Sequence, residues 1–124
     1  MKTALQQARS WEERYRIIIQ AGKNISRPTD QQLSEMQLIP GCEAKLWFQF
    51  TRKNDRTFTF QAYSEARIIN GLLWFLLQEI NGKTAEELHN FNIIDYFTQL
   101  NIAQRLSTTR LNGLRQIGGI LESL

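Results

Sequence analysis

The chain has 124 residues, of which 42% are hydrophobic and 22% charged, and its formal net charge is +3. At this length we expect one domain, whose core can bury about two thirds of the surface of the unfolded chain. The most apolar stretch, residues 68–80, is too short to cross a membrane. The cluster of Arg52, Lys53 and Arg56 is too sparse for a nucleic-acid site, and we interpret it as a solvated hairpin tip.

Cysteine usage and the first residues predict the compartment. Cys42 is the only cysteine, so the chain can form neither an internal disulfide nor a cysteine-rich metal site. Residues 1–25 carry polar and charged side chains throughout and lack the apolar central region of a secretory signal. We therefore expect a cytoplasmic location, where thiols stay reduced.

The N-terminal third predicts one long helix and one short one. Residues 4–21 place apolar side chains at helical spacing, with Gly22 just past the end. Thr29 and Gln32 form a capping-box pair that predicts a short helix inside the mixed segment 22–41.

A β-hairpin is expected next. Residues 44–52 and 57–61 alternate between apolar and polar side chains, and Asn54-Asp55 offers the turn between them. One face of this hairpin collects Leu46, Phe48, Phe50, Phe58 and Phe60. Because a two-stranded hairpin is not stable alone, something apolar must cover this face.

The cover we predict is the helix at about 65–81, which leaves little polar surface, with Ser64 as its cap and Gly82 as its stop. Three helices should follow, at 85–90, 93–100 and about 108–123. Thr84 with Glu87 and then Asn92 supply N-terminal caps for the first two. The fold class is thus α+β, a single domain over residues 1–124 with helices packed on one face of a small antiparallel sheet.

The position of Cys42 favours a thiol that reacts. It follows the Pro40-Gly41 turn and precedes a strand, which suits presentation on a loop. The alternative is a small buried residue, the usual state of a free cysteine. The position by itself leaves both interpretations open.

The residues around Cys42 resemble the cysteine loop of the SufE/CsdE family of sulfur acceptors. Ile39, Gly41, Cys42, Leu46 and Trp47 fit the pattern of that loop. Four further segments match the family in the same order along the chain: residues 11–23, 64–73, 82–88 and 106–114. The resemblance therefore covers nearly the whole chain.

The resemblance implies a function and partners. Cys42 would take sulfur as a persulfide from a pyridoxal-phosphate-dependent cysteine desulfurase of the SufS or CsdA type. It would pass that sulfur to a downstream acceptor or an iron–sulfur scaffold. Such exchange depends on the thiolate, the leaving group and access, and requires no metal or cofactor in the acceptor. The chain would be a carrier and activator rather than a stand-alone enzyme, with no nucleic acid or membrane as partner.

By the same resemblance, Gly41, Glu43, Arg110, Asn112 and Gly113 lie on or near the surface that docks on the desulfurase. Glu43 after the cysteine is similar to the CsdE branch, whereas the Asn-Phe pair at 90–91 is similar to SufE. The branch, and with it the downstream acceptor, stays open.

Two other functions are weighed against sulfur transfer. One is a non-catalytic interaction domain whose cysteine is incidental. The other is a thiol enzyme that pairs Cys42 with His89, the only histidine. That pairing needs the two side chains adjacent in space, with a third group to orient the base. A metal site built from one histidine and one cysteine is not expected.

Overall fold

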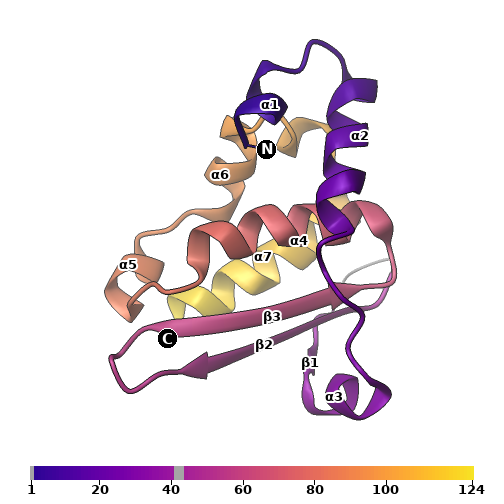
Figure 1. The fold of residues 1–124 in the computed structure, drawn as a ribbon. Coiled ribbons are helices and arrows are strands. Elements are labelled where there is room, and N and C mark those ends of the chain that lie inside the picture. Colours follow the sequence, from indigo (N-terminus) through magenta and orange to yellow (C-terminus); the bar gives the residue numbers. More distant parts are fainter. Residues whose placement is uncertain (1, 41–43) are drawn as a thin grey trace.

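The structure, a computed structural model, describes residues 2–40 and 44–124 (Figure 1). The elements in chain order are α1 (Lys2–Gln7), α2 (Trp11–Gly22), α3 (Asp30–Glu35), β1 (Gln37–Leu38), β2 (Leu46–Arg52), β3 (Phe58–Ser64), α4 (Arg67–Ile80), α5 (Ala85–His89), α6 (Ile93–Gln99), the 3-10 helix η1 (Ala103–Arg105) and α7 (Thr108–Glu122). Helices and a small antiparallel sheet in one domain confirm the predicted α+β class.

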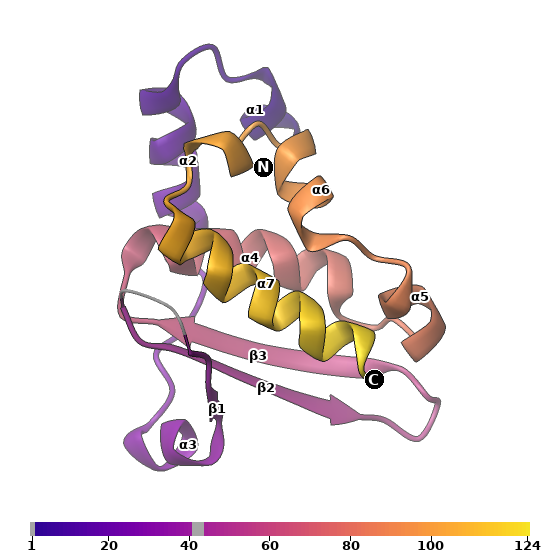
Figure 2. The ribbon, with the colours of Figure 1, turned by 180° about the vertical axis from the view of Figure 1, so that it is seen from behind.

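The sheet has the strand order β1-β2-β3, and both strand pairs are antiparallel. Helix α4 packs along β3, and α7 adds Leu114, Ile117 and Leu121 to the same core. Figure 2 shows the sheet from behind, with α7 and α4 running across it. The two-residue strand β1 was not predicted, because two residues are too few to show a strand period.

The first predicted helix is wrong in one respect: it is two helices, α1 and α2, separated at residues 8–10. Ser10 adopts an extended conformation and its hydroxyl accepts a hydrogen bond from the Glu13 N–H, which starts a new helix. The apolar spacing continues across the break, since Leu5 and Ala8 are both buried. Periodicity alone therefore could not reveal it.

Of the predicted caps, the two capping boxes and Asn92 are confirmed, and Ser64 is wrong. The capping boxes at Thr29 and Thr84 are both present, and the Asn92 side chain accepts from the Asp95 N–H. Helix α4 starts later than expected, at Arg67, with no side-chain cap. Gly82, at a φ of +81°, follows its end in a conformation that favours glycine.

The aromatic face of the hairpin is confirmed at three of its four phenylalanines. Phe48, Phe58 and Phe60 are buried among the core side chains, and the Phe48 and Phe60 rings stack with centroids 5.6 Å apart. Phe50 is 41% exposed, so its predicted burial is wrong. The last three residues of β2 are all exposed, which places Phe50 beyond the cover that the helices provide.

Helices α2 and α4 cross at very short range. A methyl group on Gly71 would lie 2.0 Å from the Ile18 carbonyl oxygen, and one on Gly22 would lie 2.8 Å from the Gly71 nitrogen. The two backbones therefore touch where no side chain fits between them.

Truncating Phe60 tests the face assignment. We expect Phe60→Ala to lower the free energy of unfolding by about 3–5 kcal/mol, because it empties a buried site. Phe50→Ala is the matched control: it truncates the directly paired residue of β2, which is partly exposed, and should cost about 1 kcal/mol. Urea unfolding of both variants measures this, and equal midpoints would show that the face is assigned wrongly.

Adding a methyl group at Gly71 tests the helix crossing. Gly71→Ala should destabilise the protein by about 2–4 kcal/mol, because α2 and α4 must separate to admit it. Gly119→Ala, also within a helix, meets nothing within 4 Å and should be neutral or stabilising by up to about 1 kcal/mol. Thermal unfolding compares the two, and a Gly71→Ala protein as stable as the wild type would contradict the crossing.

Candidate functional site

The candidate site is the connection between β1 and β2, which carries Cys42. Gly41, Cys42 and Glu43 lie outside the described residues, so their predicted roles stay predictions. The residues on either side are described. Before the connection, Ile39 is buried and its N–H donates to the Leu46 carbonyl over 2.8 Å. The preceding side of the connection is therefore fixed to the first residue of β2.

The following side of the connection is fixed to the end of β3. The Ser64 hydroxyl donates to the Lys45 carbonyl over 2.9 Å, and the Glu65 N–H donates to the same oxygen over 3.1 Å. The Ser64 hydroxyl also accepts from the Ala66 N–H, which is why it does not cap the helix as predicted. Lys45, three residues after Cys42, is thus held to the last residues of β3.

Asn70 completes this anchor from inside α4. Its side-chain oxygen accepts from the Ser64 N–H and its side-chain nitrogen donates to the Ser64 carbonyl, both over 2.8 Å. Both residues are buried, and they are the buried polar residues of the described chain. We call Lys45, Ser64 and Asn70 the anchor triad. The triad was not predicted, although an asparagine within so apolar a helix was a signal that could have found it.

An apolar row crosses the sheet beside the same connection. Leu38 pairs with Trp47 and Trp47 with Tyr63, so the three side chains lie on the face opposite Phe48. Leu38 is 52% exposed, and the half-buried rings of Trp47 and Tyr63 stack with centroids 6.0 Å apart. Trp47 is therefore only partly a core residue. We call Leu38, Trp47 and Tyr63 the outer row.

The remaining predicted docking residues lie in the first two turns of α7. Arg110 is half-buried, and its N–H donates to the hydroxyl of Ser107, which caps the helix. Asn112 is exposed, whereas Gly113 is buried and offers no side chain to a partner. The ion pairs among residues 2–40 and 44–124 do not include Arg110.

The position of His89 does not favour the thiol enzyme that would pair it with Cys42. Its ring Nε2 is hydrogen-bonded to the carbonyl of Leu124. Its helix, α5, begins beside the β2–β3 turn, where Thr57 and Thr84 form an isolated bridge. That turn is at the opposite end of the hairpin from Lys45 and Ser64.

The carboxyl groups whose pKa values are lowered lie in a turn and in a helix cap. Hydrogen bonds from the hydroxyl and then the N–H of Thr57 lower the pKa of Asp55 in the hairpin turn. Hydrogen bonds from the N–H and then the hydroxyl of Thr84 lower the pKa of Glu87 in its capping box. Both carboxylates stabilise local structure through these hydrogen bonds, and both lie away from the anchor triad.

The described part of the chain offers neither a metal site nor a membrane span. Within it, no three His, Cys, Asp or Glu side chains cluster closely enough to hold a metal ion. None of the helices described there has the length and apolar character to span a bilayer.

Comparison with known proteins assigns the class. The family described as SufE, an Fe-S metabolism associated domain, matches residues 1–123. The chain therefore belongs to the SufE family.

Two relatives and one solved structure are similar to this chain. An uncharacterized SufE-like protein of Haemophilus influenzae is 62% identical over 120 residues, which are 97% of this chain and 95% of that protein. The sulfur acceptor protein CsdE of Escherichia coli is 35% identical over 107 residues, 86% of this chain and 73% of that protein. The solution structure of a hypothetical protein from Thermus thermophilus matches the fold with a TM-score of 0.74, at 12% identity and over 96% of this chain and 85% of that one.

Removing the amide of Asn70 tests the anchor triad. We expect Asn70→Ala to lower the free energy of unfolding by about 2–4 kcal/mol, because it strands a buried N–H and C=O of Ser64. Asn112→Ala, which truncates an exposed asparagine, is the matched control and should change little. Urea unfolding measures both, and similar losses in the two variants would refute the anchor.

Proposed function

We propose that this protein is a sulfur acceptor and activator for a pyridoxal-phosphate-dependent cysteine desulfurase, with Cys42 as the residue that carries the sulfur. The observation that carries the proposal is the sole thiol of a SufE-family chain, in a connection whose flanking residues are anchored on both sides. The likeness to a protein named sulfur acceptor protein CsdE supports the same role.

The chemistry is two successive exchanges. The Cys42 thiolate attacks the outer sulfur of the desulfurase persulfide, and the desulfurase cysteine leaves as a thiolate. The new persulfide on Cys42 is then attacked at its outer sulfur by a second acceptor thiolate, and the Cys42 thiolate is the leaving group. One sulfur atom moves in each step without an external oxidant or reductant. This chemistry requires reduced thiols, which is consistent with a cytoplasmic location.

The anchors on either side of Cys42 support this role in a specific way. A carrier must bring its thiol to bonding distance of a donor and then of an acceptor. Anchoring Ile39 to Leu46 and Lys45 to Ser64 fixes the described residues on both sides of the thiol to the rest of the fold. The rest of the fold can then dock on the partner as a rigid body.

The docking surface we propose surrounds these anchors. It comprises Gly41 and Glu43 beside the thiol, with Arg110 and Asn112 at the start of α7. Gly113, which is buried, would shape the helix there rather than touch the partner. The partly exposed outer row supplies aromatic and aliphatic area of the kind that is enriched in protein interfaces. The downstream recipient would be a second protein thiol or an iron–sulfur scaffold.

Sulfur loading of Cys42 is the direct test. After incubation with a cysteine desulfurase and free cysteine, the protein should gain the mass of one sulfur atom, and peptide mapping should place it on Cys42. Cys42→Ser should gain no mass and should not stimulate the desulfurase. If Cys42→Ser supports full stimulation, the chain is an interaction domain and its cysteine is incidental.

Arg110→Ala tests the docking surface. A guanidinium can hold a carboxylate or carbonyl through two hydrogen bonds, and losing such a contact costs about 2–5 kcal/mol of binding free energy. The variant should bind and stimulate the desulfurase less, while Cys42 reacts normally with a small thiol reagent. Arg115→Ala, on an exposed position of the same helix, is the control. Equal binding by both variants would move the docking surface elsewhere and leave the role of Cys42 intact.

A further inference from the structure

Strand β3 is an edge of the sheet, and its outward main-chain groups can be identified. Hydrogen bonds join Lys45 with Glu65 and Lys53 with Thr57 across the β2–β3 ladder. Because hydrogen-bonded pairs alternate along an antiparallel ladder, the even-numbered residues of β3 direct their N–H and C=O away from β2. These outward residues are Phe58, Phe60, Ala62 and Ser64.

Most of the outward groups already have partners. Both groups of Phe58 bond to the main chain of residues 82–83, and both groups of Ser64 bond to Asn70. The Phe60 N–H donates to the side-chain oxygen of Asn81 over 2.6 Å. Along the described chain, the Phe60 carbonyl and both main-chain groups of Ala62 have no such partner. We call these three groups the edge window.

The groups of the edge window need hydrogen-bond partners from outside the described chain, which solvent or a ligand can supply. Ala62 is only 6% exposed, and a buried main-chain N–H or C=O without a hydrogen bond costs free energy comparable to a lost bond. Phe60 and Ala62 also line a groove of about 410 Å³. The missing partners can therefore be supplied by whatever occupies this groove.

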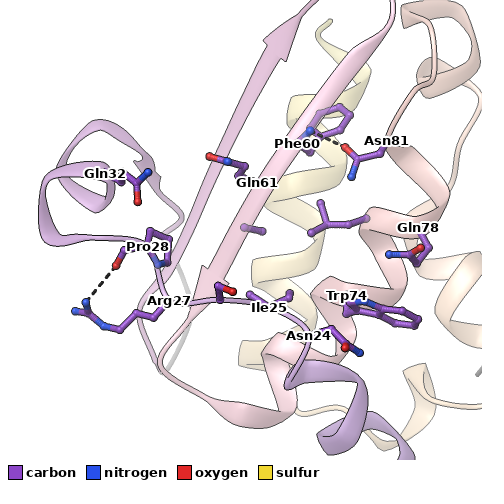
Figure 3. A pocket seen from close by; sticks show the side chains of 13 residues that line it. Asn24, Ile25, Arg27, Pro28, Gln32, Phe60, Gln61, Trp74, Gln78 and Asn81 are labelled. Atoms are coloured by element: carbon purple, nitrogen blue, oxygen red, sulfur yellow. Dashed lines mark hydrogen bonds between the residues drawn. The ribbon is translucent and has the colours of Figure 1, made fainter.

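The groove lies between the segment 24–28, β3 and the outer side of α4 (Figure 3). Its apolar walls are Ile25 and Pro28 from the segment, and Trp74 and Leu77 from α4. Amide side chains from Asn24, Gln61, Gln78 and Asn81 stand among them. Its volume is within the range of ligand pockets, about 300–1,000 Å³.

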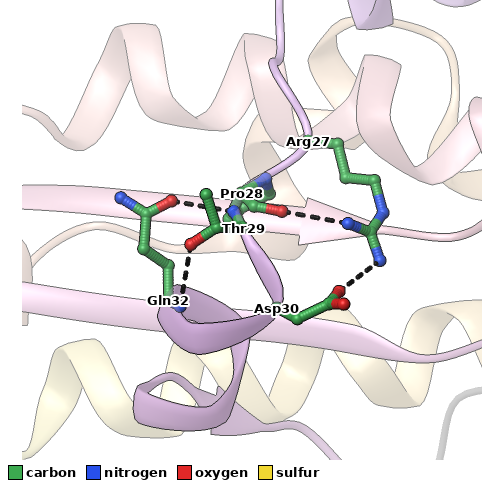
Figure 4. Close-up of polar contacts among 5 residues, drawn as sticks. All are labelled: Arg27, Pro28, Thr29, Asp30 and Gln32. Carbon is green, nitrogen blue, oxygen red and sulfur yellow. Dashed lines mark hydrogen bonds and ion pairs between the residues drawn. The ribbon is translucent and has the colours of Figure 1, made fainter.

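The outer wall of the groove has local hydrogen bonds of its own, and the one charge on it is paired. Figure 4 shows Arg27 bonded to the Pro28 carbonyl over 3.2 Å and to the Asp30 carboxylate over 3.1 Å, beside the capping box of Thr29 and Gln32. Arg27 is the charged residue among those that line the groove, and its charge is balanced by Asp30. The groove thus suits an uncharged ligand.

We propose that the edge window and its groove bind an extended, uncharged peptide segment of a partner protein. One residue of that segment would donate its N–H to the Ala62 carbonyl and accept from the Ala62 N–H, as an added strand does at a sheet edge. Alternate aliphatic side chains would contact Trp74 and Leu77. This inference does not depend on the sulfur chemistry of Cys42.

A peptide fits this window better than a second copy of β3 does. A β3–β3 ladder needs several consecutive outward residues free on both strands, but Asn81 occupies the Phe60 N–H and Asn70 occupies both main-chain groups of Ser64. A flexible peptide can form the bonds to Ala62 and then leave the edge on either side. The window is therefore matched to a segment that contacts the edge over a single residue.

The experiment uses the blocked peptide acetyl-Thr-Val-Thr-Val-Thr-amide and the full-length, nitrogen-15-labelled protein. Adding peptide should shift the Ala62 amide and Trp74 indole signals saturably and slow hydrogen exchange at Ala62, while the Gly119 amide stays unchanged. The same peptide N-methylated at its three central residues keeps its side chains but lacks main-chain donors there, and should bind about tenfold more weakly. Ala62→Pro removes the protein donor at an edge position that tolerates proline, and should weaken the unmodified peptide similarly.

Three results would overturn the proposal. One is an Ala62 signal that does not move at about 10 mM peptide, a concentration that detects even millimolar affinity. Another is equal binding of the two peptides, which would mean apolar adhesion without main-chain recognition. The last is an Ala62 signal that shifts with protein concentration alone while the protein sediments as a dimer, which would assign the edge to a second copy. If Ala62→Pro does not fold, the comparison of the two peptides decides.

Discussion

The contact between the backbones of α2 and α4 is the constraint on which the rest of the fold depends. Gly71 and Gly22 remove the side chains that would hold the helices apart, so that Ile18 packs directly on the α4 backbone. This close approach fixes α4 against the N-terminal helices. Helix α4 in turn packs along β3 and supplies more buried side chains to the apolar core than any other element does, so the position of the sheet follows from the crossing.

The same helix organises the polar contacts of β3. Asn70 in its first turn holds Ser64, and Asn81 just beyond its end holds Phe60. Two amide side chains, one in the first turn of α4 and one just past its end, therefore set both limits of the free edge. The anchor of Lys45 at Ser64 and the proposed peptide groove at Phe60 and Ala62 lie at neighbouring stretches of β3, and both depend on where α4 rests.

Features of the fold that depend on residues close together in the sequence were predictable. Features that depend on contacts between residues far apart in the sequence were not. The capping boxes at Thr29 and Thr84 were correct because their partners lie three residues away. Ser64 was predicted to cap the helix, but α4 begins only at Arg67, and the Ser64 hydroxyl instead donates to Lys45, nineteen residues earlier. At the candidate site, the role predicted for Cys42 depended on the resemblance to the SufE/CsdE family. Asn70 stood out as a polar residue within an apolar helix, but the sequence does not show that its amide bonds to the main chain of Ser64.

The dependence of β3 on α4 also shapes how the chain reaches its folded state. A β-hairpin forms within about 1–10 μs, from residues close in sequence, whereas the asparagines that protect the β3 edge arrive only when α4 docks. Until then the outward groups of Phe60 and Ser64 are open, next to a face of three phenylalanines that is still uncovered. Unpaired edges beside exposed apolar faces are the surfaces through which folding chains associate. The order of assembly therefore places the greatest aggregation risk in the interval between hairpin closure and the docking of α4.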